Sequence, residues 1–221
     1  MHDYAPLRCV IKNRISVKRV DRLGHECKQR ILHYLKLASL LSVQFVLIYG
    51  GANILSEYRS DVHRIYFDWE LAIPLLPAMV WIYASIVPLM LSPMFYLDIA
   101  QLNQLAKQLA LAMLIAGAVF LAFPGTIGYE SATNLPRAIA AIRSIDLPYN
   151  VFPSLHIALS SIIMLHLYRI FGSRGRLFLA VWLVALIASV LFTHQHHIAD
   201  VLGGLLLAWL CHRLLPVEEA R

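Results

Sequence analysis

Residues 177–200 read LFLAVWLVALIASVLFTHQHHIAD, and this stretch decides the class of fold. From Leu177 to Thr193 it contains no charged side chain, and its length approaches the roughly 20 residues with which a helix crosses a bilayer. It then becomes polar at once, with three histidines followed by Asp200. The stretch predicts a transmembrane helix that ends in a polar turn at the membrane surface.

The whole chain has the composition of a membrane protein. Of its 221 residues, 59% are hydrophobic and 14% are charged, with a mean hydropathy of +0.65, whereas soluble domains carry roughly 25% charged residues. Six stretches are apolar enough to cross a bilayer: Leu32–Leu55, Leu75–Tyr96, Ala106–Pro124, Ser154–Phe171, Leu177–Thr193 and Asp200–Leu215. We expect an all-α, polytopic membrane protein, with residues 31–215 as a six-transmembrane-helix bundle between a basic N-terminal segment, 1–30, and a tail, 216–221.

Lys and Arg are unevenly distributed along this chain of net charge +6. Many lie in the first thirty residues, and others flank later spans, such as Arg174 and Arg176. Because cytoplasmic flanks are enriched in these residues, we expect both termini in the cytoplasm. A basic segment directly before an apolar span is more typical of contact with anionic lipid than with nucleic acid, so no nucleic-acid partner is expected.

This orientation sends three polar segments to the outer side: Ser56–Pro74, Gly125–Pro153 and His194–Ala199. Within the first, the mixed polar and aromatic stretch Tyr58–Trp69 is consistent with an interfacial helix. His63 in that stretch is a weak candidate for a functional residue. The chemistry is therefore expected at the outer face of the membrane.

The turn after the fifth span contains the strongest candidates. His196 and Asp200 are four residues apart, so they share a face if a helix starts here. A carboxylate on one ring nitrogen leaves the other nitrogen basic, as a nucleophile or a base requires. His197 lies three residues before Asp200 and is a competing partner. Two other readings stay open: interfacial histidines satisfied by water and headgroups, or a metal site.

Two further outer segments contain candidate phosphate ligands. Pro153 and Ser154 fit the first turn of a helix, where free backbone N–H groups favour an anion, and His156 follows within reach as a proton donor. Arg137 and Arg143 in the preceding segment suit phosphate through bidentate hydrogen bonds. The alternatives are a capped helix with an interfacial histidine, and arginines that are merely solvated.

Together these segments resemble the type-2 phosphatidic acid phosphatase superfamily over about residues 120 to 210. Pro153-Ser154-Leu155-His156 looks like its Pro-Ser-x-His motif, and His196-x3-Asp200-Val201 looks like its third motif. The resemblance implies that His196 attacks phosphorus to form a phosphohistidine, that Asp200 orients it and that His156 protonates the leaving oxygen. It implies no cofactor and no metal, and a lipid of the bilayer as substrate.

The chain departs from the family pattern at three positions. Glu130 stands where the first motif has lysine, Ala138 follows Arg137 in place of proline, and Val190 stands where the third motif has arginine. The stretch Phe152–His156 looks closest to the inositol phosphorylceramide synthase branch, which also lacks part of the cationic set. A phosphodiester brings one negative charge and needs fewer cations than a monoester.

The resemblance therefore implies an integral enzyme of a plasma or inner membrane that moves a phosphate-bearing headgroup at the non-cytoplasmic face. Phosphate would be held by Arg137, Ser154 and Arg143. The alternatives are a lipid phosphatase acting by the same mechanism, and a non-catalytic scaffold or histidine-based metal carrier. No oligomeric state follows from these patterns.

Overall fold

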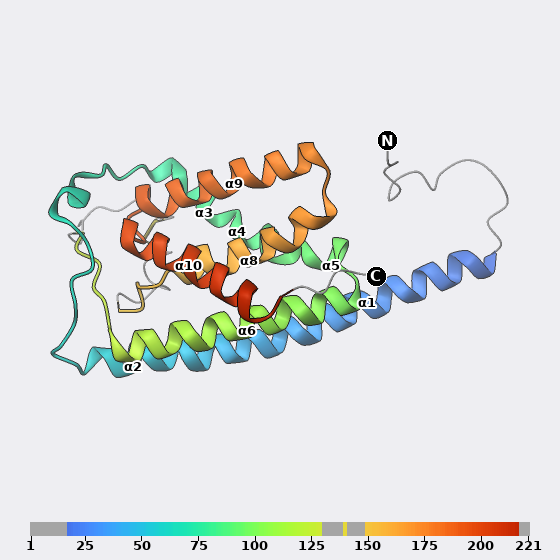
Figure 1. Cartoon of the computed structure of the whole chain (residues 1–221), viewed down its shortest axis with the longest axis horizontal. Coiled ribbons are helices and arrows are strands. Elements are labelled where there is room, and N and C mark those ends of the chain that lie inside the picture. The colour runs from blue at the N-terminus through green and yellow to red at the C-terminus, as the bar shows by residue number, and fades with distance from the viewer. Residues whose placement is uncertain (1–16, 130–138, 141–148, 217–221) are drawn as a thin grey trace.

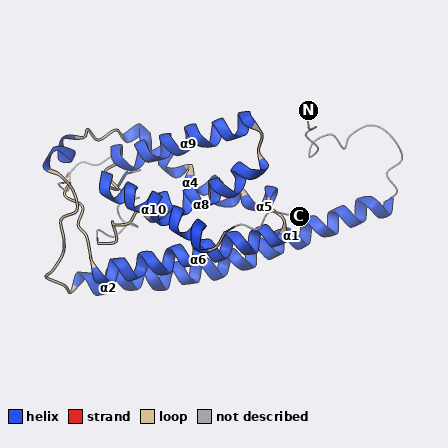
Figure 2. Ribbon diagram, in the orientation of Figure 1, coloured by secondary structure: helices blue, strands red, loops and turns tan. Residues whose placement is uncertain are grey.

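A computed structural model describes residues 17–129, 139–140 and 149–216 of the chain, with side chains from residue 24 onward. The described residues form helices and connecting loops without a strand (Figure 2). The expected all-α class is therefore confirmed. Arg137 and Arg143, the two predicted phosphate-binding arginines, lie outside the described residues.

The longest feature is a rod made from the first helices, which lies along α6 (Figure 1). The rod consists of α1 (Val17–Phe45), a π-helical turn (Val46–Gly50) and α2 (Gly51–Glu57), and α6 spans Ile99–Ala122. Two side-chain contacts join the pair: His33 Nε2 lies 2.7 Å from Asn103 Oδ1, and Gln44 Nε2 donates to the Ala110 carbonyl at 2.9 Å. The rod and α6 form one side of the bundle.

The proline-rich second span is broken, as its sequence predicts. It divides into a 3₁₀ turn (Pro77–Met79), α3 (Val80–Ala84), α4 (Ile86–Leu91) and α5 (Pro93–Tyr96). Pro77 and Pro93 each start one of these pieces, where a missing N–H costs nothing. The breaks let this segment follow the surface of α8 and α9.

At the centre of the bundle, α8 (Leu155–Ile170) packs against α6, α9 (Ser173–Phe192) and α10 (Ile198–Leu214). Gly204 permits the closest of these contacts, because a Cβ there would lie 2.6 Å from the backbone oxygen of Ser154. Small residues at such positions are typical of closely packed membrane helices. This contact brings the N-terminal ends of α8 and α10 together.

In the part of the chain that the structure describes, four helical segments are long and apolar enough to cross a membrane: Gly24–Glu57, Pro77–Tyr96, Ile99–Ala122 and Ser173–Phe192. A fifth, α8, is apolar but shorter. Large apolar side chains also face outward on α9 and α10, among them Val184 and Leu206. Such a surface fits lipid better than water, so these helices support an integral membrane protein.

Two helices begin before the expected spans, and one expected helix is a loop. Helix α1 starts at Val17, inside the basic segment, and α6 starts seven residues before Ala106 because Asp98 caps it, with its Oδ1 accepting the Gln101 N–H at 2.8 Å. The stretch Tyr58–Trp69 is not an interfacial helix. It is a loop whose backbone pairs with the segment after α6 through the His63 N–H and the Pro124 carbonyl, 2.8 Å apart, and it ends in a 3₁₀ turn (Asp68–Ala72).

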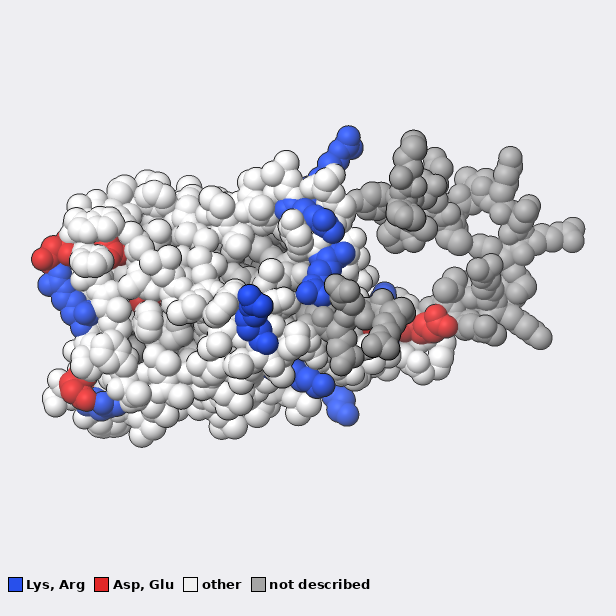
Figure 3. Space-filling view, in the orientation of Figure 1, with Lys and Arg blue, Asp and Glu red and all other residues white. Residues whose placement is uncertain are grey.

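The two ends of the bundle differ in charge. On the face that Figure 3 shows, Lys and Arg gather in a band at the end where α8 stops and α9 begins, whereas the opposite end shows acidic and basic side chains together. Arg174, Arg176 and Arg213 lie near the helix termini of the banded end, and Lys107 lies in the first half of α6. The histidine turn lies at the other end.

Candidate active site

The histidine turn begins with a helix C-cap at the end of α9. The Gln195 N–H bonds the Val190 carbonyl and the His194 N–H bonds the Leu191 carbonyl, both at 3.0 Å, the pattern in which a helix closes on a left-handed residue. His194 takes that conformation with φ of 58°, usually left to glycine. Its ring stacks on Tyr129 at 3.7 Å, and its Nε2 donates to the Ile73 carbonyl at 2.8 Å. His194 therefore shapes the turn.

His196 contacts a different set of residues from those that His197 contacts. Its Nε2 lies 3.2 Å from Nδ1 of His156 on α8, and its Nδ1 lies 3.5 Å from Oδ2 of Asp200. The His196 side chain is only 6% exposed. The structure thus brings together the three residues whose sequence spacing and motifs singled them out.

Asp200 makes a second contact that fixes its position. As the third residue of α10, it reaches back so that Oδ2 accepts the His197 N–H at 2.8 Å, which satisfies a free donor of the first turn. Its backbone oxygen accepts the Ser154 N–H at 3.0 Å. The same residue therefore caps α10, faces His196 and joins the starts of α8 and α10.

His156, at the second position of α8, contacts a residue that the sequence analysis missed. Its Nε2 lies 2.7 Å from the hydroxyl of Tyr83 on α3, while its Nδ1 faces His196. Tyr83 lies in an apolar span, where a lone tyrosine gave no signal of a functional role. The side chains of four residues thus contact one another in a line, in the order Tyr83, His156, His196 and Asp200.

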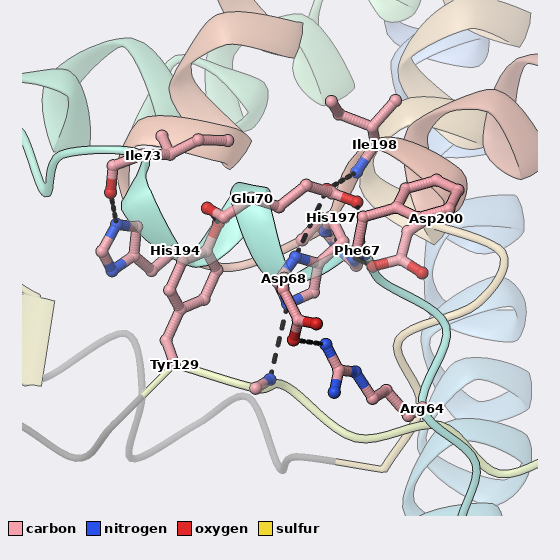
Figure 4. Close-up of polar contacts among 12 residues, drawn as sticks. Arg64, Phe67, Asp68, Glu70, Ile73, Tyr129, His194, His197, Ile198 and Asp200 are labelled. Carbon is pink, nitrogen blue, oxygen red and sulfur yellow. Dashed lines mark hydrogen bonds and ion pairs between the residues drawn. The ribbon is translucent and has the colours of Figure 1, made fainter.

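Glu70 is the other residue that the sequence analysis missed, and it forms a second histidine–carboxylate pair (Figure 4). It is 0% exposed; its Oε2 lies 3.4 Å from His197 Nδ1 and accepts the Ile198 N–H at 2.8 Å, and its Oε1 accepts the Phe67 N–H at 3.0 Å. A signal existed in the sequence: an acidic residue directly before an apolar span is costly unless it is paired. Glu70 joins the loop that ends at Phe67 to the start of α10.

His197 is enclosed by aromatic rings. Tyr66 stacks on one side at 4.3 Å and Tyr129 at 4.6 Å, while the Gly128 N–H points to Nε2 at 3.4 Å. Burial lowers the pKa of His197, and the nearby Asp200 and Glu70 only partly oppose that shift. Burial, together with the same two carboxylates, raises the pKa of Tyr129 to about 12. Both rings are therefore expected to be neutral near pH 7.

A small cavity opens beside the His156–His196 contact. Its polar lining also includes the buried Asn150 and Gln195, and its other walls include Tyr49. Asn150 donates to the Tyr49 carbonyl at 2.6 Å, whereas its Oδ1 is buried without a hydrogen-bond partner. Among the described residues that line it, none is Lys or Arg.

The remaining candidates lie elsewhere or have other contacts. The buried Ser154 caps α8, with its Oγ accepting the Ile157 N–H at 3.4 Å. His63 stacks on Phe123 at 3.9 Å, in the loop that pairs with the segment after α6. In the described part of the chain, no three His, Cys, Asp or Glu side chains are grouped as metal ligands.

The comparisons with known proteins give one match. A family model described as the PAP2 superfamily matches residues 63–214, which contain both histidine–carboxylate pairs, His156 and Tyr83 but not Tyr49. No curated protein and no solved structure matches the chain. The family match thus covers the loop before Glu70 as well as the helices that bear the histidines.

Proposed function

This chain belongs to the PAP2 superfamily of phosphoesterases and phosphotransferases, and we propose that it transfers a phosphate-bearing lipid headgroup through a phosphohistidine on His196. One observation carries the proposal. His196 presents Nδ1 to Asp200 at 3.5 Å and Nε2 to His156 at 3.2 Å. A nucleophile, its orienting carboxylate and a proton donor are thereby in line at one buried point.

The carboxylate determines which nitrogen attacks. When Nδ1–H of His196 faces Asp200, the lone pair is left on Nε2, the atom directed at His156. Attack on phosphorus joins Nε2 to the phosphoryl group and places positive charge on the ring, which Asp200 stabilises. The lipid alcohol leaves as the phosphorus–oxygen bond breaks.

His156 supplies the proton for that leaving oxygen. It is held from the far side by the Tyr83 hydroxyl, 2.7 Å from Nε2, so that Nδ1 points toward the reaction. A phosphoryl group does not fit between two nitrogens 3.2 Å apart, so the two rings separate when substrate enters from the side of Asn150 and Gln195. In the second half of the reaction, His156 accepts a proton from the acceptor alcohol, and the phosphohistidine is resolved.

Two features favour transfer over hydrolysis. The described cavity lining offers neutral polar groups, which suit the single negative charge of a phosphodiester. Glu130 and Val190 replace two cations of the family pattern. This reading agrees with the inositol phosphorylceramide synthase-like branch, with Arg137 and Arg143 as the cations left to hold the phosphoryl oxygens.

The proposed place of reaction is the non-cytoplasmic face of a plasma or inner membrane, in a six-helix bundle with both termini in the cytoplasm. What supports it is the charge of the two ends. The band of Lys and Arg surrounds one end of the bundle, and the reactive histidines lie at the other.

A donor assay tests the function. Purified protein in liposomes receives lipid phosphodiesters labelled in the phosphate, and the label is expected in a new lipid when an acceptor alcohol is present. Label released as free headgroup or phosphate would instead identify a lipid phosphatase that uses water.

The nucleophile is tested in the same assay. His196→Ala should abolish both turnover and the acid-labile, base-stable label on the protein that a phosphohistidine gives. His63→Ala, which alters an outer histidine outside the site, serves as the matched control and should retain both. Turnover in His196→Ala at the wild-type rate would contradict the mechanism.

A further inference from the structure

The most prominent unassigned feature of the molecule is an apolar groove of about 430 Å³ between α1, α6 and α8, with the α4–α5 region along one edge. Its walls are aliphatic and aromatic; the few polar groups include the hydroxyl of Tyr34, which already donates to the Met90 carbonyl at 2.7 Å. The volume is that of a ligand site. An interior so poor in hydrogen-bonding groups suits hydrocarbon.

The groove lies directly beneath the reactive cavity on the same helices. On α8, Leu155 lines the cavity, while Leu159, one turn deeper, lines the groove. On the long rod, Tyr49 lines the cavity and Phe45 lines the groove, and their rings stack at 4.9 Å. Tyr49 and Phe45 thus form a wall shared by the two spaces.

The π-helical turn Val46–Gly50 lies at this junction. A π turn displaces the residues after it from the ordinary helical register, and such turns are frequent at functional sites. Here the Tyr49 carbonyl accepts side-chain amide donors from Asn53, at 3.2 Å, and Asn150, at 2.6 Å. The turn fixes the place where the cavity meets the groove.

The length of the groove limits its occupant. It follows α1 from Val46 down to Tyr34, which is about 18 Å at the helical rise of about 1.5 Å per residue. Lys36 and Lys107 lie within two residues of Tyr34 and Ala106, which line the groove, so its lower end lies toward the basic band. A chain that fills the groove therefore extends from the cavity toward that end of the bundle.

We infer that this groove binds the hydrocarbon chain of the lipid whose phosphate reacts at His196, and that the enzyme selects substrates whose chain is long enough to reach the lower end of the groove. The inference rests on the proposed function. A chain held along α1 and α8 would fix the phosphate against the histidine line, because positioning of this kind contributes strongly to rate. A short chain reaches the histidines but leaves the groove without its ligand.

Chain-length dependence tests the inference. Single-chain phosphodiester donors, from butyl to icosyl, are assayed with wild-type protein and with Ala106→Phe, which fills the groove from α6. Wild-type kcat/KM should rise toward icosyl. In the variant, kcat/KM for the icosyl donor should fall on the order of tenfold to a hundredfold, because misplacement of a substrate alone costs about that much. For the butyl donor, kcat/KM should change less than about twofold.

Ala118→Phe is the matched control, because Ala118 is exposed on the same helix and does not line the groove. It should keep the wild-type profile. An equal loss of kcat/KM for the butyl and icosyl donors in Ala106→Phe, or no change for either, would contradict the proposal that the groove binds the chain. If the wild type turns over no member of the series, the proposed function fails instead.

Crosslinking gives a second measurement that does not depend on turnover. An icosyl donor with a diazirine at the chain end should label Tyr34 or Leu102 at the lower end of the groove in the His196→Ala protein. Excess unlabelled icosyl donor should prevent the labelling. Labelling confined to the upper end of the groove would contradict the inference. Equal labelling by a diazirine-bearing phosphatidylethanolamine in the presence of donor would show that the groove holds a bulk lipid and would also contradict it.

Discussion

Two histidine–carboxylate pairs lie side by side at the end of the bundle opposite the basic band, and they differ in what surrounds them. His196 and Asp200 come from one local segment and face His156 beside a cavity. His197 and Glu70 come from segments far apart in the chain and are closed in by Tyr66 and Tyr129. Under the proposed function, the first is the reactive pair, beside a cavity, and the second is a structural pair, sealed by aromatic rings.

Loss of the two carboxylates is expected to separate the pairs most clearly. Asp200→Asn keeps an oxygen for the His197 N–H but cannot hold His196 in the attacking tautomer, so kcat should fall about 10³-fold or more with little change in thermal stability. Glu70→Gln weakens its bonds to the Ile198 and Phe67 N–H groups and should destabilise the protein by about 2 kcal/mol.

Turnover in liposomes and thermal midpoints in detergent, measured on both variants, check this contrast. Glu70→Gln should retain kcat within about tenfold once it is folded, because it contacts no atom of the reactive line. If folded Glu70→Gln protein were as inactive as Asp200→Asn, the two pairs would act together in the reaction. The distinction between a reactive pair and a structural pair would then be wrong.

The next test breaks the alignment of His196 with His156. In Gly204→Ala the new methyl group would lie 2.6 Å from the backbone oxygen of Ser154, so α10 must move away from α8. His196 and His156 are carried on opposite sides of that contact, and a shift near 1 Å should cost about 10²-fold in kcat.

Gly203→Ala provides the matched control for this shift. Its nearest neighbour, at 2.5 Å, is the ring of Phe152, a side chain that can turn aside. Its loss of kcat should therefore be clearly smaller than that of Gly204→Ala, as measured under the same conditions. Equal losses would indicate that helix separation does not control the reaction.

The reactive pair was predictable from sequence and the sealed pair was not, for a physical reason. His196 and Asp200 lie one helical turn apart, so local spacing suggests their contact. Helical spacing also allowed His197, three residues before Asp200, and only the tertiary contacts assign His196 to Asp200 and His197 to Glu70. Glu70 reaches His197 through tertiary packing, which no local pattern contains.

The fold follows the same division. The apolar runs and the prolines of the second span predicted helices and breaks, because both are local effects. The loop over Tyr58–Trp69 was not predicted, because its backbone hydrogen bonds are made to Pro124 and Thr126 in the segment after α6. Tyr83 was missed for a related reason: its partner His156 is distant in sequence and lies on another helix.

The smallest expected effect concerns the protonation of the sealed pair. Burial lowers the pKa of His197 below its ordinary value of 6.5, so the folded protein binds this proton less readily than the unfolded chain. The stability contributed by neutral His197 is therefore present above about pH 6.5 and is lost as pH falls through the folded pKa. The thermal midpoint should decline over that acidic range.

Replacement of the ring identifies the group responsible. His197→Gln should flatten this part of the pH profile of the midpoint, whereas Tyr129→Phe should retain it. The phenylalanine ring preserves the stack on His197 and loses only the hydroxyl that donates to the Glu70 carbonyl at 3.2 Å, a cost of ~1 kcal/mol at every pH. If the pH profile of the thermal midpoint were unchanged in His197→Gln, another group would titrate in this pH range. The sealed pair would then not account for the pH-dependent stability.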